Sequence, residues 1–585
     1  MKSKKTVFLT GATGTMGHAG LVELSKRLDR FNITLLARPS KINKEKLATY
    51  EAMEGIRIVW GDLTSYQDVL NGVTGADYVL HVGGMVSPAA DYFPKKTLKV
   101  NTTAAQHIVD AVKAQPNADQ IKVVYIGSVA QTGHRNAPVH WGRTGDPINI
   151  SVYDHYAISK TIAERIFVES GIKHWACLRQ TGILCPELLF KGSDPITFHV
   201  PLDGVLEWAT AEDSGRLLAN VCEEEVPDEF WNRFYNISSG PSFRLTNYEF
   251  ESKLLKAIGC PAPEKIFEPN WFAIRNFHGQ WYTDSDLLEG YLHFRSNQTC
   301  DDYFKWMASQ VPWYFHLAKI VPPIFIKLGM GAIAKKPGLG TRNWIKNRHQ
   351  DRISAYFGSY EDWQAIPGWD KIRTKRPSET PVFLDHGYDE SKPKSEWDIE
   401  DMRKDAEFRG GKCLSPAMTK GDLSTPLDWE CQFGHRFKAS PTLVLLGDGA
   451  RDQAVGVRGF TAVGRLQGFF DVREERDHRN AEFHALAGDL EEFVDAQAVD
   501  AGHGRNRLAK AGALDHEDRE NQIVGGHDVF AHQAAGEVVM THAAHANAGI
   551  RAKSLHLVFL RIKRRLRRCR SLSEALPLLY SFGLS

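Results

Sequence analysis

The alternation of strand-like and helix-like segments over the first 180 residues constrains the fold of this 585-residue chain more than any other feature. Short runs of β-branched and apolar residues are separated by longer segments with helical periodicity. The runs cover residues 6–10, 33–37, 56–60, 78–82, 123–126 and 175–178. This alternation is typical of a parallel sheet with helices on both faces. We therefore expect an α/β fold with a Rossmann-type doubly wound parallel sheet.

The first run leads directly into a glycine-rich turn, TGATGTMG at residues 10–17, and then into a helical pattern. Glycine permits a tight strand-to-helix turn and lets the backbone approach a pyrophosphate closely, while the helix N-terminus offers free N–H groups to the negative charge. A glycine turn without a ligand is the alternative. The context favours a dinucleotide site, and the expected contact residues are Gly11, Thr13, Gly14, Thr15, Met16 and Gly17.

The residue after the second run distinguishes between the two nicotinamide dinucleotides. An acidic residue there binds the ribose hydroxyls of NAD, whereas a cation accommodates the additional phosphate of NADP. The sequence has Arg38, with Lys41 and Lys44 close behind. We expect NADP as the cofactor, with NAD as the alternative. The basic residues could also be solvated side chains at the start of a helix, without a role in cofactor binding. Asp62, after the third run, is placed to accept a hydrogen bond from the adenine amino group.

Three polar residues fall where such a fold needs catalytic groups. Ser128 ends the fifth run, and Tyr156 and Lys160 are four residues apart, hence on one helical face. Ligands of doubly wound sheets bind at the carboxyl ends of the strands, so these side chains should converge there. Tyrosine, with a pKa near ~10, is a poor acid or base at neutral pH, but a neighbouring ammonium group stabilises its phenolate and lowers this pKa. We therefore expect Lys160 to lower the pKa of Tyr156. Serine would then polarise a carbonyl oxygen.

Together these motifs resemble the extended branch of the short-chain dehydrogenase/reductase superfamily, the NAD(P)-dependent epimerase/dehydratase family. The resemblance covers about residues 5–310 and includes GDL at 61–63, LHVGG at 80–84, VNTTAA at 100–105, LRQTGILCP at 178–186 and YNISSG at 235–240. It implies that Ser128, Tyr156 and Lys160 are the catalytic triad, that Lys160 also binds the nicotinamide ribose, and that Asn101 supports the site. The further cofactor contacts that it implies are Leu63 and Gly83.

The residues after Ser128 bear on the reaction. Dehydratases of the family carry an Asp-Glu pair there, whereas this chain has Val129, Ala130 and Gln131, which cannot transfer a proton. Arg38 disfavours the NAD-retaining epimerases. The resemblance then implies an NADP-dependent oxidoreductase, similar to the hydroxysteroid dehydrogenase and dihydroflavonol reductase branch, that interconverts a small-molecule carbonyl and alcohol. The alternatives are an NAD-dependent sugar-nucleotide epimerase and a non-catalytic dinucleotide-binding sensor.

Two positions depart from the family pattern. The separation between Ser128 and Tyr156 is a little long, and Gln180 stands where the family more often has proline. Both departures leave the catalytic groups in place, and we expect them to reshape the pocket.

Changes in pattern along the chain predict four parts. Residues 1–182 form the NAD(P)-binding Rossmann domain, and residues 183–311 form a smaller α/β substrate-binding domain, whose many aromatic side chains line a bulky apolar substrate or simply form its core. Residues 312–447 are a C-terminal extension. Beyond residue 447 lysine is scarce, and every tryptophan lies at or before Trp429. We expect residues 448–585 to be disordered or a non-native translation, with an unusual genuine extension as the alternative.

The end of the extension, WECQFGHRF, resembles the first half of a zinc ribbon. Cys431, with His435 or Cys413, could ligate zinc, which needs about four such ligands. No Cys-x-x-Cys pair follows, so we expect an incomplete site and no metal.

Composition bounds the partners and the compartment. The net charge of +1 gives no reason to expect nucleic acid as a partner. The eight cysteines lack regular spacing, which is typical of reduced thiols in a cytosolic protein. The N-terminus lacks the apolar region of a signal peptide. Residues 320–334 are interrupted by prolines and a lysine and are too short to cross a bilayer. We expect a cytoplasmic protein without a membrane partner, and the resemblance implies a homodimer formed through the helix that carries Tyr156.

Overall fold

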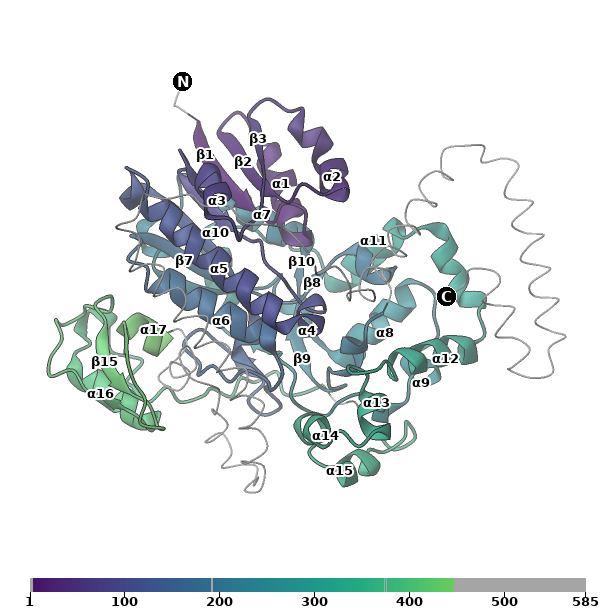
Figure 1. Cartoon of the computed structure of the whole chain (residues 1–585). Helices are drawn as coiled ribbons and strands as arrows, with labels where there is room; N and C mark the ends of the chain where they lie inside the picture. The colour runs from purple at the N-terminus through teal and green to yellow at the C-terminus, as the bar shows by residue number, and fades with distance from the viewer. Residues whose placement is uncertain (1–3, 191–192, 373, 375, 447–585) are drawn as a thin grey trace, which may run out of the picture. The chain divides into compact units, whose positions relative to one another are not determined.

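The computed structural model describes residues 4–190, 193–372, 374 and 376–446 (Figure 1). The chain divides into two units, Met1–Gly502 and His503–Ser585, and every described residue lies in the first. The expectations for residues 448–585 therefore lie outside the described residues.

A seven-stranded parallel sheet organises the first half of the chain, with the strand order β3-β2-β1-β4-β5-β7-β11. Its strands are β1 (Lys5–Thr10), β2 (Phe31–Ala37), β3 (Ile56–Trp60), β4 (Tyr78–His81), β5 (Lys122–Ser128), β7 (His174–Gln180) and β11 (Arg233–Ile237). The first six strands match the six predicted runs. The order reverses at β1, as in a doubly wound sheet, so the predicted Rossmann-type fold is confirmed.

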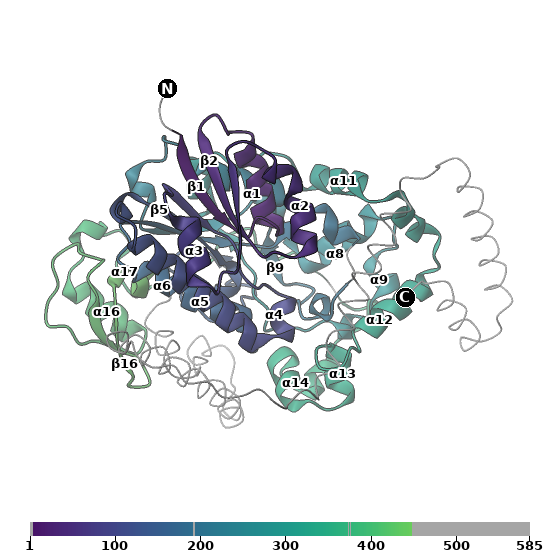
Figure 2. The ribbon, with the colours of Figure 1, turned by 45° about the horizontal axis from the view of Figure 1, so that its top comes forward.

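Helices cover both faces of this sheet (Figures 1 and 2). Apolar residues of α1 (Thr15–Ser25), α2 (Lys41–Glu51), α7 (Ala211–Asn220) and α10 (Ser285–Leu292) form one core cluster with the strands. Residues of α3 (Tyr66–Val73), α5 (Pro94–Lys113) and α6 (His155–Val168) form the cluster on the other face. The close packing of α5 against α6 places the helix that carries Tyr156 beside β5.

The segment 183–311 builds a smaller set of elements and also returns to the main sheet. Its own short strands are β8 (Ile183–Leu184), β9 (Val205–Glu207), β10 (Ala209–Thr210), β12 (Arg244–Thr246) and β13 (Trp281–Tyr282). Its own helices include α8 (Asn247–Ala257), α9 (Pro263–Ile266) and α11 (Cys300–Gln310). However, β11, α7 and α10 also come from this segment, and aromatic residues such as Phe230 and Tyr235 join the core of the sheet.

The extension begins with helical elements: η8 (Trp313–Ile320), α12 (Pro323–Ile333), α13 (Thr341–Lys346), α14 (Gln350–Phe357) and α15 (Tyr360–Ala365). It ends with α16 (Ile399–Phe408), the antiparallel strands β14 (Lys412–Cys413), β15 (Leu427–Glu430) and β16 (Arg436–Ala439), and α17 (Pro441–Leu446). Buried Trp397, Trp429 and Leu443 join the core cluster of α5 and α6.

Two properties of the described residues bear on membranes and metals. No single described helix is long and apolar enough to cross a membrane; the pair Trp313–Ile320 and Pro323–Ile333, bent by 110°, meets that length and composition only when taken together. Among the described residues no group of three or more His, Cys, Asp or Glu side chains could hold a metal ion. Cys431 Sγ lies 3.6 Å from His435 Nδ1.

Candidate active site

The turn between β1 and α1 requires glycine at two predicted positions. Gly11 has a φ of +78°, and a Cβ on it would lie 2.8 Å from the Cα of Gly83. A Cβ on Gly17 would lie 2.2 Å from the carbonyl oxygen of Gly11. These contacts are far shorter than van der Waals distances, so the turn keeps its shape only without these side chains.

The same turn leaves backbone donors available to a ligand. Gly14 is the N-cap of α1. The N–H groups of Thr15 and Met16 lie in the first turn, where a helix has no acceptors of its own, and no side chain caps this helix end. The Met16 side chain is buried in the core of the sheet, which leaves its backbone to face a ligand. The carbonyl of Thr13 accepts a hydrogen bond from Lys46 Nζ at 3.1 Å. This arrangement fits a pyrophosphate at the helix N-terminus.

We expect Gly17→Ala to destabilise the protein by about 3 kcal/mol, because the added methyl group collides with the backbone of the turn, and to abolish dinucleotide binding. Gly14→Ala is the matched control for folding, since its Cβ would lie at 3.4 Å from the same Gly11 oxygen. Urea unfolding and NADPH fluorescence titration measure the two effects. Wild-type stability and binding in Gly17→Ala would contradict this reading of the turn.

The ends of β1 and β4 are joined by a buried polar contact that the sequence analysis did not identify. Thr10 Oγ1 accepts hydrogen bonds from the N–H groups of Gly83, at 2.9 Å, and Val82, at 3.1 Å, and lies 3.0 Å from His81 Nδ1. Burial, with the nearby charge of Lys160, lowers the pKa of His81 to about 3, so its imidazole is neutral. The contact holds Gly83 against the glycine turn, and a Cβ on Gly83 would lie 2.9 Å from Leu63 Cδ1.

Arg38 and Asp62 follow the neighbouring strands β2 and β3. Asp62 Oδ1 accepts hydrogen bonds from the backbone N–H of Thr64, at 2.8 Å, and from its hydroxyl, at 2.7 Å. Burial alone would raise the pKa of Asp62, but the Thr64 hydrogen bonds and the charges of Arg38 and Lys96 outweigh it and lower this pKa. Arg38 is exposed. The exposed guanidinium and the ionised carboxylate therefore lie at the same edge of the sheet.

Ser128, Tyr156 and Lys160 come together as predicted. Asp154 caps the N-terminus of α6, with Oδ1 accepting from the N–H of Ala157 at 2.8 Å, so the helix begins at His155 and Tyr156 lies in its first turn. The Tyr156 phenol lies beside Ser128, which favours its ionised form. Lys160 Nζ lies 6.0 Å from the centre of the Tyr156 ring. Burial raises the pKa of Tyr156 to about 12, Ser128 opposes this shift, and the charge of Asp154 adds to it. The prediction that Lys160 lowers this pKa is therefore wrong for the protein without its ligands, because burial outweighs any effect of the ammonium group.

Two hydrogen bonds hold Lys160 in place. Its ammonium group donates to the carbonyl of Ile126 at 2.8 Å, and its own carbonyl accepts from the Tyr125 hydroxyl at 3.0 Å. Burial lowers the pKa of Lys160 to about 8, and the charge of Glu164 opposes this shift. Glu164 is itself paired with Arg179 of β7 at 2.6 Å, with 0% and 1% of the side chains exposed. Sequence signals for this pair were an acid four residues after Lys160 and an arginine inside an apolar strand.

Asn101 supports the site from α5 rather than facing a reacting group. Its Nδ2 donates to Ser159 Oγ, at 2.8 Å, and to the carbonyl of Met85, at 2.9 Å, while Oδ1 accepts from the Met85 N–H at 2.7 Å. Asn101 thus ties α5 to α6 and to the loop after β4. Gln180 lies opposite Ser128 in the β5–β7 ladder.

The segment between Ser128 and Tyr156 contacts the extension. Buried Asp146 accepts from Arg135 Nη1 at 2.7 Å and lies 2.8 Å from Nε2 of His386. The carbonyl of Ser378 accepts from Trp141 Nε1 at 3.0 Å. Residues 378–386 of the extension therefore brace this active-site segment.

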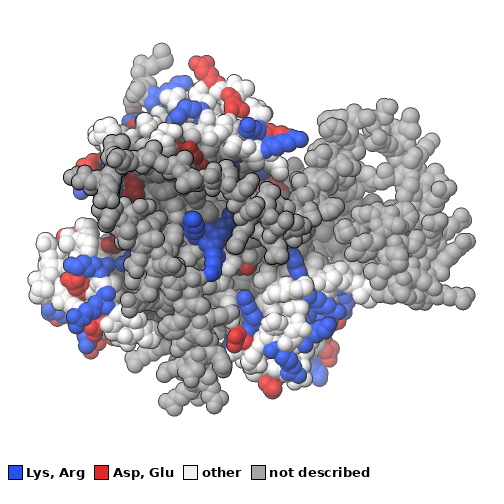
Figure 3. All heavy atoms as spheres, viewed as in Figure 1, with Lys and Arg blue, Asp and Glu red and all other residues white. Residues whose placement is uncertain are grey.

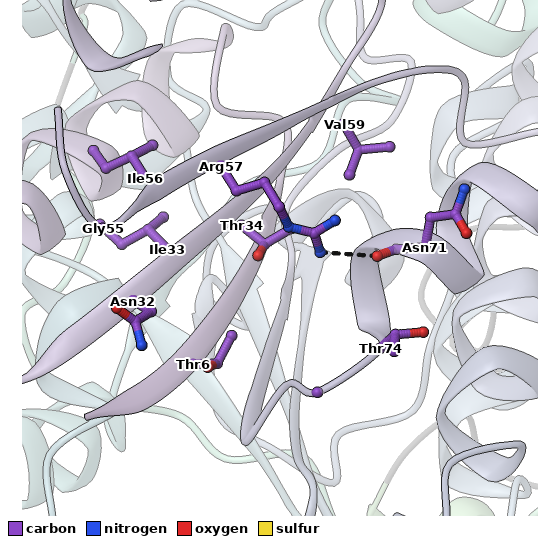
Figure 4. A pocket seen from close by; sticks show the side chains of 11 residues that line it. Thr6, Asn32, Ile33, Thr34, Gly55, Ile56, Arg57, Val59, Asn71 and Thr74 are labelled. Atoms are coloured by element: carbon purple, nitrogen blue, oxygen red, sulfur yellow. Dashed lines mark hydrogen bonds between the residues drawn. The ribbon is translucent and has the colours of Figure 1, made fainter. Parts of the chain in front are cut away.

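A hollow of about 930 Å³ lies elsewhere on the sheet (Figure 4). Thr6, Asn32 and Thr34 line it, and on its other side Arg57 Nη2 donates to the carbonyl of Asn71 at 2.9 Å. None of the candidate catalytic residues lines it. Because its lining includes Thr6 and Asn32, at the amino ends of β1 and β2, it does not belong to the crevice at the carboxyl ends where such folds bind ligands.

Comparison with known proteins gives consistent relatives. Residues 7–179 match the model of the NAD dependent epimerase/dehydratase family. Short-chain dehydrogenase/reductase family 42E member 1 of Xenopus laevis is 22% identical over 332 residues, which cover 51% of this chain and 77% of that protein. UDP-glucose 4-epimerase of Rickettsia typhi is 26% identical over 111 residues, which cover 18% of this chain and 32% of that protein.

Solved structures with a similar fold include two that contain NAD. dTDP-glucose 4,6-dehydratase from Bacillus anthracis has a TM-score of 0.41 at 12% identity, covering 53% of this chain and 96% of that chain. UDP-glucose 4-epimerase from Bifidobacterium longum, in complex with NAD⁺ and UDP, has a TM-score of 0.41 at 16% identity, covering 52% of this chain and 97% of that chain.

Proposed function

Since residues 7–179 form a domain of the NAD dependent epimerase/dehydratase family, the extended short-chain dehydrogenases/reductases, we propose that this protein is an NADP-dependent oxidoreductase. It interconverts a carbonyl and an alcohol on a small molecule by hydride transfer. The observation that carries this proposal is the grouping of Ser128, Tyr156 and Lys160 at the carboxyl end of β5, with Lys160 Nζ 6.0 Å from the centre of the Tyr156 ring. The glycine turn and the free N–H groups at the start of α1 fit a dinucleotide.

The residues of the triad have distinct roles in this proposal. The bound nicotinamide supplies or accepts the hydride. Ser128 donates a hydrogen bond to the substrate carbonyl oxygen. With a pKa near 12, Tyr156 is protonated at neutral pH and donates its proton to the oxygen during reduction. The ammonium group of Lys160, held by the carbonyl of Ile126, stabilises the phenolate that remains.

The turn that follows Ser128 supports hydride transfer over dehydration. It forms the short helix η2 (Val129–Thr132), in which the amide oxygen of Gln131 accepts from the N–H of Ser128 at 2.8 Å. Elimination requires a separate acid and base, and this turn supplies neither. The Gln131 amide instead fixes the backbone from which the Ser128 hydroxyl projects.

We expect Arg38→Asp to reverse the cofactor preference from NADPH to NADH, with a change in the ratio of the two Kd values of at least about tenfold. The carboxylate would repel the additional phosphate and accept from the ribose hydroxyls. Fluorescence titration of the full chain with each nucleotide measures this. Lys26→Asp, an exposed charge change at the other end of α1, should leave the ratio unchanged. If wild type and Arg38→Asp had the same ratio of Kd values for NADPH and NADH, Arg38 would have no role in binding the cofactor.

Sugar-nucleotide epimerisation is the second candidate. It is favoured by the match to the Rickettsia typhi protein named UDP-glucose 4-epimerase, which is 26% identical to this chain over 111 residues. An epimerase of this type would retain its nucleotide through purification and convert UDP-glucose without added cofactor. Absorbance of the denatured protein's supernatant and chromatography of a UDP-glucose reaction distinguish it from an oxidoreductase, which would exchange NADPH freely.

A further inference from the structure

The start of the C-terminal extension exposes a series of large apolar side chains. Trp313 is 67% exposed, Ile320 51% and Ile324 53%, and Tyr314 and Leu328 are also exposed. We call these five residues the 313–328 apolar face. They belong to η8 and α12, so a single stretch of chain carries the whole face.

Helix α12 is apolar on the side that faces the protein and on the side that does not. Ile326, Met330 and Ile333 pack against the core cluster that contains Phe267 and Trp271. Ile324 and Leu328, one turn apart, are exposed instead. A helix that is apolar all round is typical of one buried on every side. Because the described protein covers only one side, the other side is suited to an apolar partner.

The charged side chains carried by this stretch of the chain have one sign. Residues 303–350 contain no Asp or Glu. The cations between residues 313 and 350 are Lys319, Lys327, Lys335, Lys336, Arg342, Lys346 and Arg348. Lys327 pairs with Glu268, but Lys319, Lys335 and Lys346 are exposed and have no carboxylate partner among the described residues. Figure 3 shows Lys and Arg side chains gathered over the α13 and α14 region, with some acids among them.

We propose that the 313–328 apolar face and its lysines bind the surface of a bilayer that contains anionic lipid. Tryptophan and tyrosine favour the membrane–water interface, and apolar side chains inserted beside lysines are typical of segments that lie in the headgroup region. The 110° bend between η8 and α12 fits a segment that enters and leaves the same leaflet. A second copy of the chain is a poorer partner, since it would bring the same positive charges into contact.

The test is co-sedimentation of the full chain with vesicles of phosphatidylcholine alone or mixed with phosphatidylserine. Wild type should sediment with the mixed vesicles and be released by salt. Lys319→Glu/Lys335→Glu should weaken binding about tenfold or more, because two attractive charges become repulsive. Ile324→Ser/Leu328→Ser should weaken binding at all salt concentrations. Leu414→Ser/Phe433→Ser removes two exposed apolar side chains from another part of the extension and should have no effect.

Three results would overturn the proposal. One is wild type that stays in the supernatant with both kinds of vesicle. Another is equal loss of binding in Leu414→Ser/Phe433→Ser and in the variants of the 313–328 apolar face. The third is self-association in sedimentation velocity that Ile324→Ser/Leu328→Ser abolishes without any change in vesicle binding, which would assign the face to a second copy. Circular dichroism checks that each variant is folded, and NADPH titration shows that the outcome is independent of the proposed function.

Discussion

Replacing Tyr156 with phenylalanine should reduce the rate of carbonyl reduction by about a hundred- to ten-thousand-fold while leaving NADPH affinity within about threefold of wild type. The ring and its packing remain, so the substitution removes only the hydroxyl beside Ser128. Without it, the site lacks the proton donor that the proposed function assigns to α6. The measurement is NADPH oxidation with whichever aldehyde or ketone wild type reduces, together with a fluorescence titration.

Tyr291→Phe serves as the matched control for Tyr156→Phe, because it removes a hydroxyl that donates to Glu229 on the surface, at 2.9 Å. It should leave both rate and affinity unchanged. If Tyr156→Phe retained more than a third of the wild-type rate, another proton donor would have to be sought. If it lost NADPH binding as well, the substitution would be structural and the assignment would have to rest on Ser128 and Lys160.

Arg179→Met should lower the free energy of unfolding by about 3–5 kcal/mol. Arg179 and Glu164 form a fully buried pair, with Nη2 at 2.6 Å and Nε at 3.1 Å from the two carboxylate oxygens. Methionine fills a similar volume, but it leaves the Glu164 carboxylate buried without its partner, which costs far more than losing an exposed pair. Urea unfolding followed by circular dichroism gives the difference.

The comparison for Arg179→Met is Lys5→Met, which breaks the exposed Lys5–Asp77 pair of 3.0 Å in the same sheet. Exposed pairs contribute about 0–1 kcal/mol, so Lys5→Met should have little effect. A loss below about 1 kcal/mol in Arg179→Met would mean that Glu164 finds another partner or takes up a proton at small cost. Because Glu164 also opposes the lowered pKa of Lys160, losing the pair would disturb the triad as well as the fold.

The parts of this molecule that follow from local pattern were predictable. Six strands of the sheet were recognisable from short apolar runs, and the carboxyl ends of parallel strands meet at one edge, so Ser128, Arg38 and Asp62 could be placed without coordinates. The Tyr156–Lys160 spacing fixed a shared helical face. These inferences need only the periodicity of strands and helices and the topology of a doubly wound sheet.

The parts that depend on long-range contacts were not predictable. Strand β11 pairs with β7 only after a segment of more than fifty residues that itself contains short strands and α7, and nothing in the five residues of β11 identifies that partner. The contact between Thr10 and His81 joins two strand ends through side chains that each look like ordinary strand residues. The Asp146–His386 pair is 240 positions apart in the chain. Such contacts depend on tertiary packing, which a local sequence pattern does not encode.

The contacts between the extension and the segment that follows Ser128 determine how much of the chain the candidate site requires. The residues that would do chemistry all precede position 161, yet the chain that shapes their surroundings continues to His386. A fragment ending near residue 311 would keep every catalytic group, but it would leave Trp141 without the carbonyl of Ser378 and Asp146 without the imidazole of His386. The part of the chain that shapes the candidate site is therefore longer than residues 7–179, which match the family model, and substitutions in residues 378–386 should alter that site.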